Sequence, residues 1–144
     1  MNKYVILIIL AAVIVGGGIV YRGFIQDESA KGIDTGVVRE LTVIAKKNEW
    51  RFAPEEFEVN QGDTIKMTAI NEDDYDHGLA IEAVGVSQKM PANSTVTFEF
   101  KVTKAGDYPF YCSVPCGAGE VEGKHRAHED MLGVIHARSV IETR

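Results

Sequence analysis

Residues 108–133 read YPFYCSVPCGAGEVEGKHRAHEDMLG, and this stretch contains both cysteines of the 144-residue chain, Cys112 and Cys116. Two histidines and a methionine follow at three-residue steps: His125, His128 and Met131. Thiolate, imidazole and thioether groups are the side-chain ligands of soft and borderline metal ions. Their concentration directly after an aromatic, strand-forming segment predicts a metal site at the end of a β-strand.

A disulfide is the simplest alternative, because two cysteines in an exported domain usually pair. A bridge across so short a loop constrains the unfolded chain less than a long one does, and it leaves the histidines and the methionine unexplained. Zinc accepts two cysteines and two histidines, but the thioether of Met131 favours copper. A copper site of this kind takes another ligand from a distant strand. The candidate is His77, which opens the segment HGLAI (77–81) after an acidic turn.

Alternating and β-branched segments recur at intervals of about ten residues, with turn residues between them. The expected strands cover residues 37–45, 48–52, 57–60, 64–71, 77–81, 95–102, 108–112 and 132–141. No segment outside the N-terminus has a sustained helical period. The pattern predicts an all-β, antiparallel sandwich whose core is built from strand aromatics, Trp50 among them.

The N-terminal segment differs from the rest of the chain. Residues 4–20 carry no charge and lie between Lys3 and Arg22. The length of this segment is close to the roughly 20 apolar residues that a helix needs to span a bilayer. We therefore expect a membrane anchor over residues 1–22, with a cleaved signal sequence as the alternative. A polar linker (23–36) and one globular domain (37–144) follow. Either reading places the domain outside the cytoplasm, on the periplasmic or extracellular side of the cytoplasmic membrane.

The net charge of −6 argues against a nucleic-acid partner, which needs a basic face. An acidic run, residues 72–76 (EDDYD), precedes His77. Its simplest interpretation is a solvated loop. The functional alternative is an electrostatic landing surface for a basic cytochrome.

The sequence motifs resemble the cupredoxin domain of cytochrome c oxidase subunit II, which carries the binuclear copper-A (CuA) centre. The resemblance covers roughly residues 40–140 and rests on three motifs: Asp76-His77-Gly78, Cys112-Ser113-Val114-Pro115-Cys116-Gly117, and His128-x-x-Met131-Leu132-Gly133. It implies a cupredoxin-like Greek-key β-sandwich that binds two copper ions. The single apolar segment before the domain is similar to the single-anchor branch of that family.

The resemblance also implies a role for each matching residue. Cys112 and Cys116 would bridge both ions, His77 and His128 would each bind one ion, and Met131 and the carbonyl of Val114 would be weak axial ligands. Two departures stand out. Residues 120–127 form an apparent insertion, which brings His125 as an additional or alternative ligand and is expected to be a mobile loop. Val114 stands where oxidase subunits commonly have a carboxylate, which also serves a magnesium site.

Two functions therefore stay open. The first is a membrane-tethered electron carrier, an oxidase subunit II or a stand-alone relative, whose partner is cytochrome c or another one-electron redox protein. The second is an extracytoplasmic copper chaperone or sensor with an exchangeable site. We expect no catalytic activity of its own, because protein groups fill every expected coordination position.

Overall fold

The computed structural model describes residues 3–6, 13–14 and 34–140, and the chain separates into two compact units, Met1–Gly32 and Ile33–Arg144. Residues 3–6 and 13–14 are helical. Within these described ranges no helix has the length and apolar character needed to cross a membrane. The expected anchor and linker lie largely outside the described residues, so both remain predictions.

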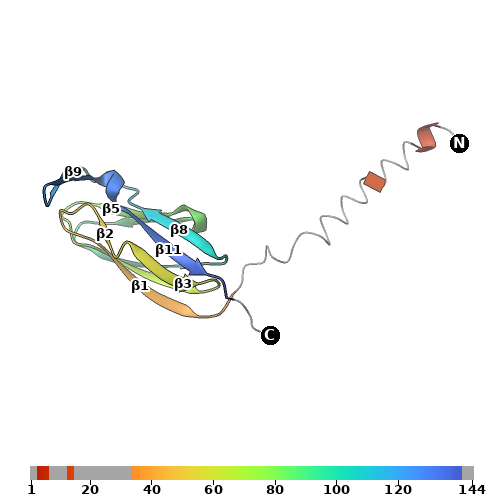
Figure 1. Cartoon of the computed structure of the whole chain (residues 1–144), viewed down its shortest axis with the longest axis horizontal. Helices are drawn as coiled ribbons and strands as arrows, with labels where there is room; N and C mark the ends of the chain where they lie inside the picture. Colours follow the sequence, from red (N-terminus) through yellow and green to blue (C-terminus); the bar gives the residue numbers. More distant parts are fainter. Residues whose placement is uncertain (1–2, 7–12, 15–33, 141–144) are drawn as a thin grey trace. The chain divides into compact units, whose positions relative to one another are not determined.

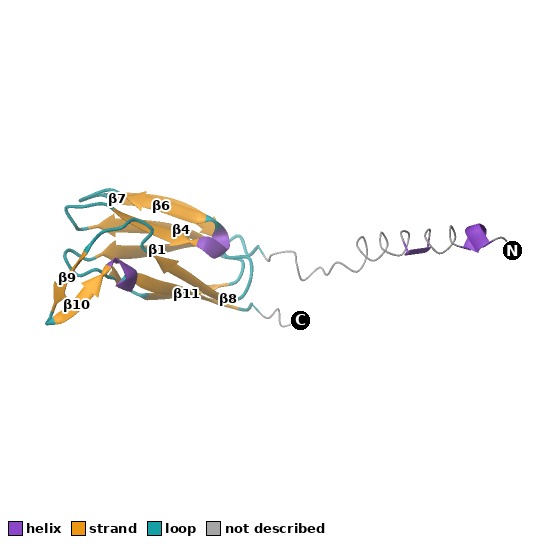
Figure 2. Cartoon of the chain, turned by 90° about the horizontal axis from the view of Figure 1, so that it is seen from above, coloured by secondary structure: helices purple, strands orange, loops and turns teal. Residues whose placement is uncertain are grey.

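The second unit is built from two β-sheets and a hairpin (Figure 1). The first sheet has the order β2-β1-β4-β7, with β1 at Val38–Ala45, β2 at Phe52–Ala53, β4 at Thr64–Asn71 and β7 at Thr95–Lys101. The second has the order β3-β11-β8-β5-β6, with β3 at Glu56–Asn60, β5 at His77–Ile81, β6 at Val86–Met90, β8 at Gly106–Tyr111 and β11 at Leu132–Arg138. The hairpin pairs β9 (Ala118–Val121) with β10 (Lys124–Ala127), and it projects from one end of the sandwich (Figure 2).

Period-two burial explains why these segments form the two layers. In β4 every second residue is buried, beginning with Ile65 and Met67, so one face of the strand packs inward. The strand β5 is buried along its whole length, as expected for a strand covered on both faces. Phe52 from the first sheet meets Phe110 from the second with ring centroids 5.6 Å apart. The core therefore lies between the sheets, and the expected all-β sandwich is confirmed.

The strand pairing corrects part of the sequence-based expectation. The pairs β1–β4 and β3–β11 are parallel, so the expected antiparallel sandwich is wrong for these two pairs. Residues 47–49 form a turn and residues 50–51 have no regular structure, so only Phe52 of the expected strand 48–52 belongs to β2. The strand β6 was not anticipated. The insertion at 120–127 belongs to an ordered hairpin and is not an irregular loop.

A buried carboxylate joins the start of β1 to the turn before β4. Asp63 is 1% exposed and accepts hydrogen bonds from Arg39 Nε at 2.9 Å, the Asn60 backbone N–H at 3.1 Å and Thr35 Oγ1 at 3.1 Å. Burial raises the pKa of the Asp63 carboxyl, but these hydrogen bonds outweigh burial and hold it below its ordinary value of 3.8. The bonds therefore stabilise the fold at neutral pH, and that contribution is lost as the pH falls below about 3.8.

Replacing this carboxylate tests the contribution of the network to stability. Asp63→Asn removes the charge that strengthens three hydrogen bonds, so we expect the free energy of unfolding at pH 7 to fall by about 2 kcal/mol. Denaturant unfolding measured from pH 7 to pH 2.5 should show the wild type losing its advantage below about 3.8. Glu40→Gln, which alters an exposed ion pair with Lys66, is the control and should change little. A difference between Asp63→Asn and wild type that does not vary with pH would contradict this account.

Candidate metal centre

Strand register brings the two halves of the predicted site together at the hairpin-bearing end of the sandwich. Tyr111, the last residue of β8, pairs with Leu132, the first residue of β11, and also with Ala80 of β5. One step further, the Cys112 backbone N–H donates to the Met131 carbonyl at 3.0 Å. Sheet hydrogen bonding therefore places Cys112, Met131 and the start of β5 within one small volume.

The two cysteine sulfurs lie close together without being bonded. Cys112 Sγ and Cys116 Sγ are 3.9 Å apart, whereas a disulfide holds its sulfurs at about 2.05 Å. Both residues are free thiols, Cys112 buried and Cys116 half-buried. The geometry does not match the disulfide alternative, and it leaves both sulfurs free to act as ligands.

Each sulfur has its own imidazole and its own weak donor atom. Around Cys112 Sγ, His77 Nδ1 lies at 3.7 Å and the Val114 carbonyl oxygen at 3.2 Å. Around Cys116 Sγ, His128 Nδ1 lies at 3.6 Å and Met131 Sδ at 3.5 Å. The structure thus brings together all six residues that the sequence selected as ligands. Each of the two sulfurs has one imidazole and one weak donor atom beside it.

The insertion keeps His125 apart from this cluster. Within the hairpin His125 pairs in register with Glu120, and its Nδ1 lies 3.6 Å from the Glu120 carboxylate. The His125 side chain is 69% exposed. His128 instead begins a short 3-10 turn, η3 (His128–Asp130), and its backbone N–H donates to the Gly117 carbonyl at 2.9 Å. His125 and His128 therefore belong to different elements, because His125 lies in β10 and His128 begins the turn that follows it.

A buried carboxylate that the sequence reading missed supports His77. Asp73 is 0% exposed, and its Oδ2 lies 2.8 Å from Nε2 of the equally buried His77. The Asn48 backbone N–H also donates to Asp73, at 2.7 Å. This contact directs His77 Nε2–H toward Asp73 and leaves Nδ1 free to face Cys112. A carboxylate behind a ligating histidine is the usual way in which proteins orient such a ring.

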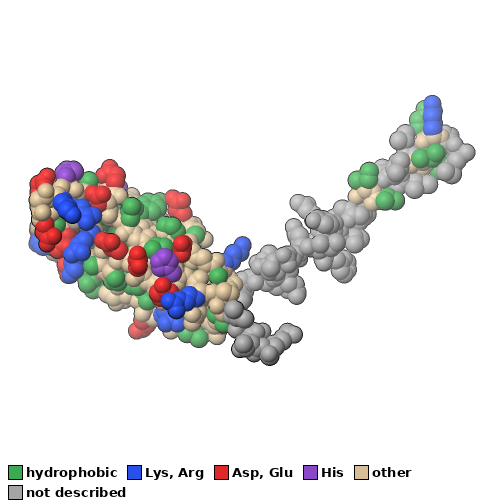
Figure 3. Space-filling model, viewed as in Figure 1, with side chains coloured by type: hydrophobic (Ala, Val, Ile, Leu, Met, Phe, Trp, Pro, Cys, Tyr) green, Lys and Arg blue, Asp and Glu red, His purple; other side chains and the backbone are tan. Residues whose placement is uncertain are grey.

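The remaining acidic residues before His77 are neutralised by lysines. Ion pairs join Glu72 to Lys46, Asp74 to Lys47 and Asp76 to Lys89. Figure 3 shows acidic and basic side chains interspersed on the visible face of the domain rather than separated into patches. Asp73 is therefore the buried member of a run whose other carboxylates are solvated and paired with lysines, and the landing surface stays a prediction.

The charge state of the metal-free site follows from these contacts. Burial raises the pKa of the Cys112 thiol, but hydrogen bonds to His77 and the Gly78 backbone outweigh burial and lower it to about 6. Burial and the adjacent Cys112 raise the pKa of Cys116. Burial lowers the pKa of His77, but its contacts with Cys112 and Asp73 raise it overall. The Cys112 thiol therefore loses its proton more readily than the Cys116 thiol, and metal binding to a protonated sulfur would release its proton.

Two glycines allow the cysteine loop to pack closely on its surroundings. A Cβ atom at Gly78 would lie 2.3 Å from Ser113 Oγ, so only glycine lets β5 approach the loop between the cysteines. A Cβ atom at Gly119 would lie 2.3 Å from the Trp50 ring, and Trp50 Nε1 donates to the Cys116 carbonyl at 3.1 Å. Trp50 thus braces the loop in addition to packing against the core, as expected for it.

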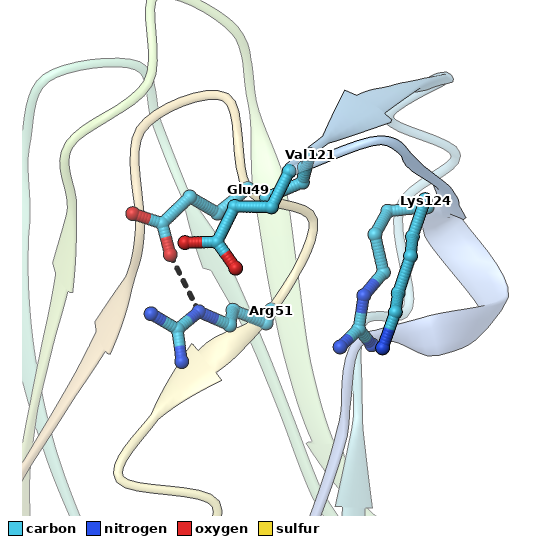
Figure 4. A pocket seen from close by; sticks show the side chains of 6 residues that line it. Glu49, Arg51, Val121 and Lys124 are labelled. Carbon is cyan, nitrogen blue, oxygen red and sulfur yellow. Dashed lines mark hydrogen bonds and ion pairs between the residues drawn. The ribbon is translucent and has the colours of Figure 1, made fainter.

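A charged cleft of about 490 Å³ lies between the hairpin and the turn before β2. Figure 4 shows Arg51 paired with Glu49 on one side, Val121 above them and Lys124 reaching in from β10. Its lining contains no cysteine or histidine. The cleft is therefore separate from the predicted metal site.

The donor set fits a soft metal ion well. Two sulfurs, two imidazole nitrogens and a thioether suit copper better than the oxygen ligands preferred by magnesium or calcium. Within the described residues, His77, Cys112 and Cys116 have ligand atoms that all lie within 4.8 Å of one another. The burial of His77 and Cys112 would limit the access of water to the ion.

Comparisons with known proteins agree with the fold. Residues 25–121 match the family model described as a cupredoxin-like domain. The nitrous-oxide reductase of Stutzerimonas stutzeri is 33% identical over 85 residues, which is 57% of this chain but only 12% of that protein. Auracyanin A, a "blue" copper protein from Chloroflexus aurantiacus, has 18% sequence identity and a TM-score of 0.57 over 70% of this chain and 99% of that one. The periplasmic domain of cytochrome oxidase subunit II from Bradyrhizobium japonicum has 20% identity and a TM-score of 0.50, over 69% and 84% of the two chains.

The contact between Asp73 and His77 generates a prediction about metal affinity. Asp73→Asn removes the negative charge that orients the His77 ring, so we expect copper affinity to fall about 10- to 100-fold. Competition with a chelator of known affinity measures the change. Asp74→Asn, in the neighbouring exposed carboxylate that pairs with Lys47, should leave affinity unchanged. Equal effects of the two substitutions would show that general charge, and not the buried contact, determines affinity.

Proposed function

This chain belongs to the family of cupredoxin-like domains, which bind copper, and we propose that it is an electron-transfer protein with a binuclear centre of the CuA type. In this proposal the thiolates of Cys112 and Cys116 would hold two copper ions between them. His77, His128, Met131 and the Val114 carbonyl would supply the remaining ligands.

The pairing of the two sulfurs carries the proposal. A mononuclear blue copper site has one cysteine, and a second thiol would have no function in it. Here both sulfurs face the same space, and each has a separate imidazole and a separate weak donor within 3.7 Å. Two equivalent half-sites around a sulfur pair support two ions better than one.

Electron transfer at such a centre needs ligands that move little between redox states. Bound copper would supply a group that accepts and releases one electron. Three contacts each restrain one ligand-bearing segment. They are the backbone hydrogen bond from Cys112 to Met131, the bond from Trp50 to the Cys116 carbonyl, and the contact of Asp73 with His77. Because these restraints do not depend on metal charge, the chain keeps reorganisation small.

A redox partner would reach the centre most directly beside His128. Leu132, at the start of β11, is 56% exposed, and it lines two adjacent surface hollows with Tyr111. One of these hollows is also lined by Cys112 and His128. In this proposal the partner is cytochrome c or another one-electron protein, and the domain works outside the cytoplasm, held at the membrane by its N-terminal segment. The domain would do so as an oxidase subunit II or as a stand-alone relative.

A copper chaperone or sensor is the second candidate, and one observation favours it. The hollow of about 330 Å³ lined by Cys112 and His128 opens toward solvent, so ions could enter and leave there. His77 and Met131 are fully buried, which favours retention of the metal instead. The balance of burial supports the electron carrier.

Counting copper in cysteine variants tests the proposed centre. The loaded wild type should hold two copper ions per chain and be purple, whereas Cys116→Ser should hold at most one and lose that colour. Serine oxygen cannot replace a bridging thiolate, because its bond to copper is less covalent. Met131→Leu should keep the colour and raise the reduction potential, as expected for loss of a weak axial donor. One ion per chain in the wild type, with a strong blue band, would instead indicate a mononuclear site.

The two histidines beside the hairpin separate ligand from bystander. His128→Ala removes the imidazole that lies 3.6 Å from Cys116 Sγ, so we expect the purple centre to be lost or distorted. His125→Ala alters an exposed residue and should leave the absorption spectrum intact. Absorption spectra of both loaded variants decide the assignment. The reverse result would transfer the ligand role to His125, and no effect of either substitution would favour the exchangeable site of a chaperone.

A further inference from the structure

The strand β10 places two cations on one face of the projecting hairpin. Lys124 and Arg126 are two positions apart in the strand, so their side chains point the same way, and both line the cleft of about 490 Å³. His125, between them, points to the other face and lies beside Glu120. The cationic side of β10 is therefore one wall of the cleft, and Figure 4 shows Lys124 extending into it.

No carboxylate of the described domain neutralises these two cations. Every other lysine and arginine of that part of the chain forms an ion pair, with the single exception of Lys104. The residues opposite Lys124 and Arg126 across the hairpin are Val121 and Gly119, which carry no charge. Arg126 is also half-buried, and its side chain has no hydrogen-bond partner among the described residues. Because a half-buried guanidinium loses hydration without gaining an acceptor, its position indicates an anionic group supplied from outside the chain.

The opposite wall of the cleft does not supply that group. Glu49 accepts a hydrogen bond from Arg51 on the same wall, so this pair is balanced within itself. Glu122, in the hairpin turn, lines the cleft but forms no ion pair with a described cation. An anion would therefore be attracted to the β10 wall, and the charge of Glu122 would oppose that attraction without cancelling it.

We propose that Lys124 and Arg126 form a binding site for a small molecule that carries carboxylate or phosphate groups. A guanidinium binds such a group through two parallel N–H donors, and a lysine adds a compact charge. The Cα atoms of the two residues are about 7 Å apart along the strand, so one compact ligand can contact both side chains. The cleft volume of about 490 Å³ is typical of small-molecule sites. None of the proposed copper ligands lines the cleft, so the inference does not depend on the metal centre.

Calorimetric titration of the full-length chain with citrate and with inorganic phosphate tests the site. The metal-free protein is used because both anions also bind copper. At constant ionic strength, at least one of the two anions should bind with a stoichiometry of one per chain. Lys124→Gln and Arg126→Gln should each weaken that binding about tenfold, since each removes a charged hydrogen-bond donor. Lys104→Gln is the matched control, because it removes the third unpaired cation from outside the cleft and should leave the affinity unchanged.

Two carboxylates of the hairpin test the same site in the opposite direction. Glu122→Gln removes a negative charge from the cleft and should strengthen anion binding about threefold. Glu120→Gln removes the same charge from the other face and should not. The inference would be overturned if the wild type bound neither anion, if Lys104→Gln weakened binding as much as Lys124→Gln, or if the two glutamate variants bound equally well. Binding of a polyglutamate peptide without binding of either small anion would assign the wall to an acidic protein and would also overturn it.

Discussion

The separation of 3.9 Å between two unbonded sulfurs is the constraint on which the rest of the site depends. Outside the cytoplasm, where we propose that the domain works, cysteines at this spacing would tend to form a disulfide, so the fold must hold them apart. Cys112 is fixed by its backbone bond to Met131, the residue directly before β11, and Cys116 is held through its carbonyl by Trp50. Opposite sheets therefore anchor the two ends of the loop, since Trp50 precedes β2 in the first sheet while β8 and β11 belong to the second.

The buried pair of His77 and Asp73 shows that the fold tolerates an unfavourable desolvation free energy at this end of the sandwich. Taking a carboxylate out of water is costly, and a buried ion pair seldom repays that cost through stability alone. Asp73 is fully buried and accepts two hydrogen bonds, one of which orients an imidazole toward a sulfur. The arrangement is easier to understand as preparation of a ligand than as a contribution to folding.

The cluster of candidate ligands could be predicted from the sequence because its signal is local. Spacing marks Cys112, Cys116 and Met131 with both His125 and His128, and the family resemblance favours His128 over His125. Period-two patterning identified most strands for the same reason. Parallel pairing of β1 with β4 could not be predicted in this way, because the partner of a strand depends on contacts distant in the sequence.

Two features that the sequence did not predict, the hairpin and the burial of Asp73, lack a distinctive local pattern. The hairpin at 118–127 has polar side chains on both strands, so no hydrophobic alternation marks it, although Glu122 and Gly123 both adopt the positive φ angles typical of a tight hairpin turn. Asp73 was hidden among acidic neighbours, and only the fold distinguishes the one carboxylate that turns inward. Its position four residues before His77 was the single available signal.

The central claim is that one chain holds two metal ions that share a pair of thiolates. Electron-spin resonance of the oxidised, copper-loaded domain tests it most directly, because an unpaired electron shared equally by two copper nuclei gives a seven-line hyperfine pattern. We expect the seven-line pattern. A four-line spectrum, from an electron confined to one copper, would contradict it.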